Sequence, residues 1–238
     1  IASPNVVLNT IMAQELEEFA DILEQSNDFQ VDLQNLLHDT FKAHQRIIFN
    51  GNGYGEDWVQ EAQRRGLSNL RDTVDCMPAY IDPKNIRLFA GHNILSETEM
   101  RARYEIHLEN YCKVTAIEAS TLRDMVLRGI LPAVNRYTAD LTQAILHKRE
   151  LVVPCRVEED LLQKLSALTG SLYDTMAAIN EAMDKAPDAE GGIDAARYYR
   201  EEIVRRMEEA RQSIDQLESL TAAKYWPYPT YADILFSV

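Results

Sequence analysis

The chain has 238 residues, and its 24 Lys and Arg against 38 Asp and Glu give a formal net charge of −14 at pH 7. With 46% hydrophobic and 26% charged residues, it lies in the range of ordinary globular proteins rather than disordered ones. The acidic balance argues against nucleic acid and anionic membrane surfaces as partners, because both attract a basic face, and no run of about 18 apolar residues offers a membrane span.

The cysteines and the first residues favour a cytoplasmic protein. Cys76, Cys112 and Cys155 are odd in number and widely spaced, so they do not make a disulfide framework and suit a reducing compartment. The chain starts at Ile1 without a basic segment followed by an apolar one. We therefore expect no intact secretory signal and interpret the start as lying inside a longer polypeptide.

Helical periodicity dominates the first 45 residues. One helix is predicted to end near residue 25, with apolar residues on one stripe at steps of four and three: Leu8, Met12, Leu16, Phe19 and Leu23. Residues 25–28 are a break by composition. A second helix is predicted after them, with these residues on one side: Leu33, Leu36, Leu37, Phe41 and His44.

Three glycines fall within residues 51–55, just before the next predicted helix. Such a stretch is either a tight turn or a loop whose amides cradle a phosphate. No Lys or Arg lies in residues 51–62, and Glu56 and Asp57 would repel an anion. The sequence therefore favours a structural turn, in which we expect Gly53 to have a positive φ.

A long helical tract is predicted from a capping box at Ser96 and Glu99 towards residue 150. The Ser hydroxyl and the Glu carboxylate can each satisfy a free N–H group of the first turn. Pro132 lies inside this tract, where it removes one backbone donor and clashes with the preceding turn. We therefore expect the helix to kink or restart within one turn of Leu131.

The last third is predicted to form a helical hairpin at about residues 157–222. Apolar residues step by fours and threes in both arms, at 161–183 and 203–217, which is close to heptad spacing. Residues 186–192 between them are a turn by composition. Together the elements predict an all-α fold, a helical bundle with long antiparallel helices.

The tail after residue 224 is rich in aromatic side chains, and two prolines prevent a regular helix at its start. Exposed together, these side chains would form an adhesive patch, so we expect them to dock on this domain or on a neighbouring subunit. Both interpretations stay open. The candidates for a subunit interface are Trp226, Tyr228, Tyr231 and Phe236.

No residue is assigned a catalytic, cofactor-binding or metal-binding role. The five histidines are scattered, and neither Cys-x-x-Cys nor His-Glu-x-x-His occurs. The Gly-x-Ser-x-Gly motif of serine hydrolases is also absent from the sequence.

Several stretches, in shared order from the first residues to the last, resemble the C-terminal part of type III glutamine synthetase. They are residues 3–11, residues 49–54 with Trp58, Glu61 and Arg65, residues 103–105 with 109–113, residues 117–119, residues 130–133, and the ending 226–236. The resemblance implies a parent enzyme that joins ammonia to glutamate with ATP, through γ-glutamyl phosphate and with Mg²⁺ or Mn²⁺. It also implies a homo-oligomer of stacked hexameric rings.

The resemblance further implies a domain division and the place of the active site. Residues 1–25 resemble the last helix of the catalytic domain, and residues 26–238 the C-terminal helical domain of this type. The metal and phosphate sites of the family belong to a sheet-based region that precedes Ile1. We therefore expect this chain alone to be inactive and to serve assembly and stability.

Two other functions stay open. One is a stand-alone acidic helical module that binds a partner through its aromatic tail. The other is an independent nucleotide-binding enzyme that uses the glycine stretch, which would require a basic anchor near residues 51–55 that the sequence does not provide.

Overall fold

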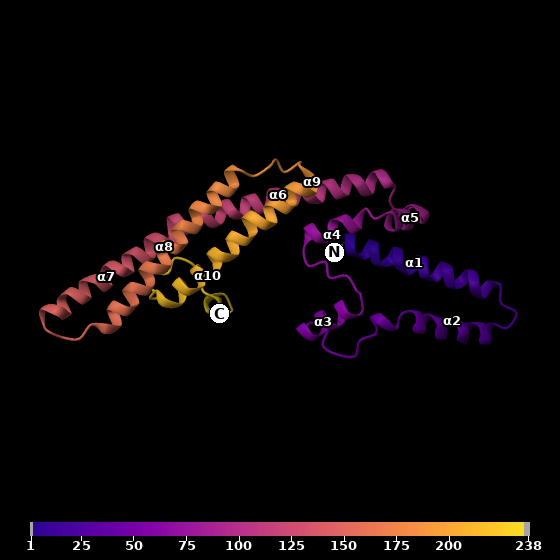
Figure 1. Ribbon diagram of the computed structural model, residues 1–238, viewed down its shortest axis with the longest axis horizontal. Helices are drawn as coiled ribbons and strands as arrows, with labels where there is room; N and C mark the ends of the chain where they lie inside the picture. Colours follow the sequence, from indigo (N-terminus) through magenta and orange to yellow (C-terminus); the bar gives the residue numbers. More distant parts are fainter. Residues whose placement is uncertain (1, 236–238) are drawn as a thin grey trace. The chain divides into compact units, whose positions relative to one another are not determined.

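The computed structural model describes residues 2–235, apart from the side chains of residues 231 and 232, and contains helices but no strand in this range (Figure 1). The expected all-α fold is thus confirmed. In chain order the helices are α1 (Ala2–Glu24), α2 (Phe29–Ala43), α3 (Glu56–Arg64), α4 (Thr73–Tyr80), α5 (Pro83–Gly91), α6 (Glu97–Met125), α7 (Leu131–Glu150), α8 (Arg156–Asp184), α9 (Gly192–Tyr198), α10 (Arg205–Leu220) and α11 (Tyr231–Leu235).

Contacts divide the chain into two compact units, Ile1–His107 and Leu108–Val238. The division falls within α6, whose first turns belong to the first unit and whose remainder belongs to the second. It is a division by packing. The expected boundary after residue 25, which follows from the resemblance to a family, stays a prediction.

The first unit has a small core that includes the first turn of α6. Its buried residues are Ile86, Phe89 and Met100, and packed against them are Val7, Tyr80, Ile81 and Leu95. α6 begins beside this core because the expected capping box forms. The Ser96 N–H donates to the Glu99 carboxylate at 2.8 Å, and the Glu99 N–H donates to the Ser96 hydroxyl oxygen at 3.3 Å.

Helix α1 has two apolar sides, of which only one is covered within the unit. On the covered side Thr10 is buried, and the Gln14 amide oxygen lies 2.9 Å from Nε2 of His92, just past the end of α5. On the other side Leu8, Met12 and Leu16 are 60%, 57% and 60% exposed. Residues four apart share one face of a helix, so these three form a continuous apolar stripe, here called the α1 stripe.

Helix α2 adds to the uncovered apolar surface of the first unit. None of its residues is fully buried. Its exposed large apolar side chains are Phe29, Val31, Leu37 and Phe41. The stripes predicted from helical periodicity are therefore present, but large parts of them have no partner within the described residues.

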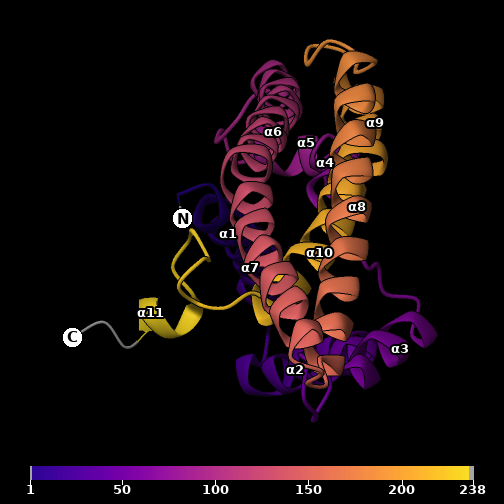
Figure 2. The same ribbon diagram turned by 90° about the vertical axis from the view of Figure 1, so that its left-hand side faces the viewer.

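The second unit is built on α8, which packs against both α7 and α10, and Figure 2 shows these helices side by side. The expected hairpin is confirmed, since α8 forms its first arm and residues 192–220 form its second. Buried residues follow the predicted seams of the two arms: Leu165, Leu172, Met176 and Ile179 in the first, and Ile203, Ala210, Ile214 and Leu217 in the second.

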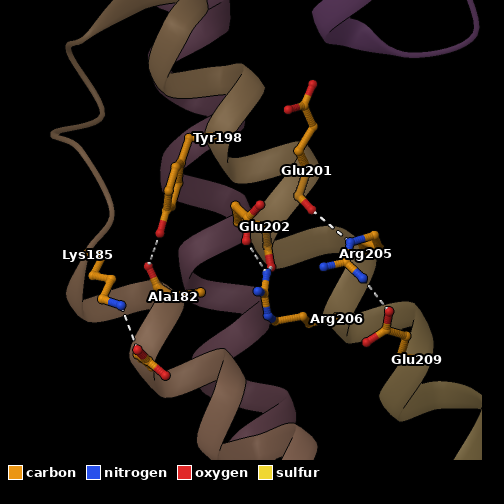
Figure 3. Close-up of polar contacts among 9 residues, drawn as sticks. Ala182, Lys185, Tyr198, Glu201, Glu202, Arg205, Arg206 and Glu209 are labelled. Atoms are coloured by element: carbon orange, nitrogen blue, oxygen red, sulfur yellow. Dashed lines mark hydrogen bonds and ion pairs between the residues drawn. The ribbon is translucent and has the colours of Figure 1, made fainter.

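The second arm contains a π-helical turn, Tyr199–Val204, that the heptad spacing does not predict. Beside this turn the Tyr198 hydroxyl donates to the Ala182 carbonyl of the first arm at 2.9 Å (Figure 3). Arg206 pairs with Glu202 one turn earlier, at 2.5 Å. The Tyr198 contact joins the two arms, whereas the ion pair lies within one arm.

The irregularity expected near Pro132 takes the form of a π-helical turn at Val126–Ile130; the tract stays helical through it, and α-helical bonding resumes in α7. The Leu131 N–H donates to the Val126 carbonyl five residues earlier. Pro132 has no N–H to donate, and its ring would clash with the preceding turn of a regular α-helix. The wider π-helical turn accommodates the ring, and Pro132 then lies in the first turn of α7, where a proline needs no hydrogen-bond acceptor.

Candidate functional site

The start of the aromatic tail folds back onto its own unit. The ring of Tyr225 packs on that of Tyr137 in α7, with centroids 5.2 Å apart, and its hydroxyl donates to the Asp140 carboxylate. The Lys224 ammonium lies 4.6 Å from the centroid of the Tyr225 ring, in a cation–π contact. These contacts hold the tail against α7.

Tyr228 lies on the π-helical turn. Its hydroxyl donates to the Met125 carbonyl at 3.2 Å. A Cβ atom on Gly129 would stand 2.5 Å from the Tyr228 hydroxyl oxygen and 3.0 Å from Cζ, so the glycine permits this close approach. The sequence does not predict this contact, although a glycine inside a helical tract, three residues before a proline, marks a place where the helix departs from the regular pattern.

Beneath the tail lies a cavity of about 410 Å³ in the second unit. Its walls come from the end of α6, from α10 and from the tail. Of the four interface candidates, Trp226 and Tyr228 come together in the tail wall and are half-buried. Tyr231 begins α11, and Phe236 lies outside the described residues. The contact of these residues with a neighbouring subunit stays a prediction.

The glycine stretch of the first unit is braced by Arg65, at the end of α3. The Arg65 guanidinium donates to the Ile48 carbonyl at 2.8 Å and to the Glu61 carboxylate at 2.5 Å. The rings of Phe49 and Trp58 stack at 4.4 Å, and the guanidinium carbon lies 5.9 and 5.8 Å from their centroids. One cluster is thus formed by four residues of the stretch that carries the family resemblance: Phe49, Trp58, Glu61 and Arg65.

The charge of this cluster is balanced internally. Arg64 and Arg65 both donate to the Glu61 carboxylate, and these hydrogen bonds lower the pKa of Glu61 from 4.5 to about 2. The positive charge of Arg65 is therefore directed at Glu61 and at backbone carbonyls rather than at an external anion.

The glycine turn is closed by Asn52. Its side-chain oxygen accepts the Tyr54 N–H at 3.0 Å, and its backbone oxygen accepts the Gly55 N–H at 3.1 Å. These amides are used within the turn, which supports a structural turn over a phosphate cradle. The predicted positive φ at Gly53 is wrong, because the Asn52 side chain closes the turn without it. A positive φ occurs at Gly66, just past the end of α3, where it is 70°.

The described part of the chain assembles no metal centre, and Cys112 and Cys155 are not activated as nucleophiles. Within it, no group of three or more His, Cys, Asp and Glu lies close enough to hold a metal ion. The pKa of Cys155 is raised by its hydrogen bond to Glu159, and burial raises that of Cys112. A nucleophilic cysteine needs a lowered pKa instead.

None of the described helices is both long enough and apolar enough to cross a bilayer.

Comparison with known proteins shows sequence similarity to one family. Residues 32–149 match the model of the glutamine synthetase C-terminal domain. The chain is 36% identical over 208 residues to a glutamine synthetase of Butyrivibrio fibrisolvens, covering 87% of this chain and 30% of the relative. It is 31% identical over 247 residues to the type-3 glutamine synthetase of Dictyostelium discoideum, covering 98% and 33%.

A glutamine synthetase of Bacteroides fragilis (strain YCH46) is 28% identical over 246 residues, covering 99% of this chain and 34% of the relative. The chain thus spans about a third of the length of the curated relatives it matches.

Proposed function

The chain belongs to the glutamine synthetase family, in which it corresponds to the C-terminal region of a type III enzyme, and from this premise we propose that it serves assembly and stability while catalysis occurs elsewhere in the parent protein. The parent would join ammonia to glutamate with ATP. We propose further that it does so in the cytoplasm, as a homo-oligomer of stacked hexameric rings.

The observation that supports an assembly role best is the uncovered apolar surface of the first unit. Leu8, Met12 and Leu16 are each more than half exposed along three turns of α1, and α2 adds Phe29 and Phe41. Large contiguous apolar patches in water are rare on proteins that act alone and are typical of interfaces. The catalytic region of the parent, or another subunit, is therefore the proposed cover of the α1 stripe.

We propose that the cofactors implied by the family bind outside this chain. The described residues hold no cluster of potential metal ligands, and two amides of the glycine turn, those of Tyr54 and Gly55, donate to Asn52. We therefore assign neither ATP nor Mg²⁺ or Mn²⁺ to this chain and derive no chemical step from its residues. Purified residues 1–238 are expected to form no glutamine and no γ-glutamyl phosphate.

The assembly role can be tested in the full-length parent with the double substitution Met12→Asp and Leu16→Asp. Two charges on the α1 stripe should reduce the native mass of the oligomer, together with its glutamine-forming activity, because an interface cannot bury unpaired carboxylates without cost. Ala13→Asp is the matched control, since Ala13 is exposed on the same helix outside the stripe.

The outcomes separate the proposal from its alternative. An oligomer of reduced mass in the double variant alone supports the assembly role. Unchanged mass and activity in the double variant contradict it. A parent gene that encodes nothing before Ile1 would instead favour the stand-alone interaction module.

A further inference from the structure

We infer that the cavity beneath the aromatic tail is a binding site for a small molecule with an apolar body and one ammonium group. The cavity belongs to the second unit alone, and the inference does not depend on the proposed assembly role. Its volume of about 410 Å³ lies within the usual range of small-molecule sites, roughly 300–1,000 Å³.

The apolar body is suggested by most of the wall. Leu122 and Met125 at the end of α6 face the cavity together with Ile214 of α10. Trp226 and Pro229 of the tail line it as well. Aliphatic and aromatic side chains on several sides favour an apolar ligand over a fully hydrated one.

The charge of the ligand follows from the polar side chains of α10. Arg211 donates to Asp215 at 2.6 Å, so these two opposite charges balance each other. Glu218 also lines the cavity, and among the described residues no hydrogen bond or ion pair involves its carboxylate. Among the described lining residues, the three side chains therefore leave one net negative charge on the wall, which attracts a cation and repels an anion.

The position of Glu218 strengthens this preference. It lies in the last turn of α10, which contains no basic residue. The C-terminal end of a helix carries a partial negative charge, so a carboxylate there is unfavourable and a cation is favoured. An ammonium group near Glu218 would meet both negative charges, and the faces of Trp226 and Tyr228 attract cations in the same way.

The tail wall is held in place without a ligand. Tyr228 is bound to the Met125 carbonyl and fits against Gly129, and Tyr225 is bound to Asp140. A wall that is already ordered costs a ligand less conformational entropy than a mobile one. The cavity is therefore suited to a small ligand that fills it rather than to one that must first close it.

The test compares three probes of similar size: 2-phenylethylamine, 2-phenylethanol and 3-phenylpropionate. Each is titrated into the 238-residue chain and followed by calorimetry and by tryptophan fluorescence. We expect saturable binding of the amine, at least tenfold weaker binding of the alcohol, and no binding of the carboxylate. The fluorescence change should persist in Trp58→Phe and disappear in Trp226→Phe.

Two further variants test whether Glu218 causes the preference for a cation. Glu218→Gln should lower the affinity for the amine to that for the alcohol while the affinity for the alcohol stays unchanged. Glu208→Gln, an exposed position on the same helix outside the cavity, should leave both affinities unchanged. Circular dichroism checks that every variant keeps its helical content.

The proposal is overturned by any of three results. These are no saturable binding of the amine at millimolar concentration, equal affinities for the amine and the carboxylate, and an unchanged affinity for the amine in folded Glu218→Gln.

Discussion

The hydroxyl of Tyr228 donates to the backbone carbonyl of Met125 at 3.2 Å, and this contact joins residues 103 positions apart in the sequence. It places the aromatic tail on the one part of the long α6–α7 tract where the α-helical hydrogen-bond pattern is replaced by a π-helical turn. The position of the tail therefore depends on the backbone geometry of that turn, because the Tyr228 ring packs directly on Gly129.

The first prediction concerns Gly129. A Cβ atom there would stand 2.5 Å from the Tyr228 hydroxyl oxygen, so Gly129→Ala should displace the tail from the π-helical turn. The helix itself gains up to about 1 kcal/mol from alanine, so the melting temperature should change little. Limited proteolysis should cut residues 221–230 faster, and Trp226 fluorescence should shift to longer wavelength.

Gly170→Ala is the control for Gly129→Ala. Gly170 lies inside α8, where an added Cβ meets nothing within 4 Å. This variant should stabilise the protein by about 0.5–1 kcal/mol and leave the tail protected. Equal protection of the tail in both variants would contradict the contact.

The second prediction concerns truncation after Lys224. Removal of residues 225–238 deletes the contacts of Tyr225 with Asp140 and of Tyr228 with Met125, so the melting temperature of the chain should fall while its helical content stays nearly intact. The native mass of the full-length parent tests the interface candidates separately. A smaller oligomer after truncation supports a subunit contact, and an unchanged mass rules it out as essential.

The third prediction compares two adjacent arginines. Arg65→Ala removes the hydrogen bond to the Ile48 carbonyl and the cation–π contacts with Phe49 and Trp58, so the first unit should lose about 1–3 kcal/mol of unfolding free energy. Arg64→Ala removes only an exposed contact with Glu61 and should have a smaller effect. Urea unfolding followed by Trp58 fluorescence measures both, and equal losses would contradict the bracing role.

The fourth prediction concerns pH. The folded pKa of Glu61, about 2, lies below its ordinary value of 4.5. Its ionised form therefore contributes stability that is fully present above about pH 4.5 and is lost as the pH falls towards 2. Glu61→Gln should flatten the acid loss of stability of the first unit in this window. Glu15 has an exposed side chain that makes no described contact, so Glu15→Gln should leave the acid loss of stability unchanged.

The fifth prediction separates two glycines of the same turn. A Cβ atom on Gly51 would stand 2.4 Å from the ring of Phe49, whereas one on Gly53 meets nothing within 4 Å. Gly51→Ala should push Phe49 off Trp58 and cost about 1–3 kcal/mol. Gly53→Ala should be nearly neutral, since Gly53 has no positive φ. Thermal unfolding of the two variants checks the order, and a larger loss at Gly53 would reverse it.

Local patterns were sufficient to predict most helices. The capping box at Ser96 fixes the start of α6 through hydrogen bonds within four residues, and the heptad spacing predicts the hairpin because its seam repeats along both arms. The fit of Tyr228 against Gly129 was not predicted, because it joins distant residues and depends on the width of one helical turn.

The missed conformation of Gly53 has a different cause. Glycine content shows where a positive φ is possible but not where it is used, and the Asn52 side chain supplied another way to close the turn. The cavity beneath the tail could not be predicted from the sequence either, because its walls come from three segments whose proximity follows only from the packing of the bundle.

The π-helical turn also changes which residues of the tract share a face. Before it, buried positions follow an α-helical rhythm at Leu108, Cys112, Thr115, Ala119 and Val126; from the end of the turn onward, they include Ile130, Leu131, Ala133, Val134, Leu141 and Ile145. The hydrogen bond from the Leu131 N–H to the Val126 carbonyl spans five residues, one more than in an α-helix, so the turn holds one extra residue. Deleting one residue within 126–130 would therefore let the tract return to α-helical bonding while α7 keeps nearly the same rotation about its axis. The ring of Pro132 would then meet the preceding turn of a regular α-helix, so the extra residue makes room for the proline.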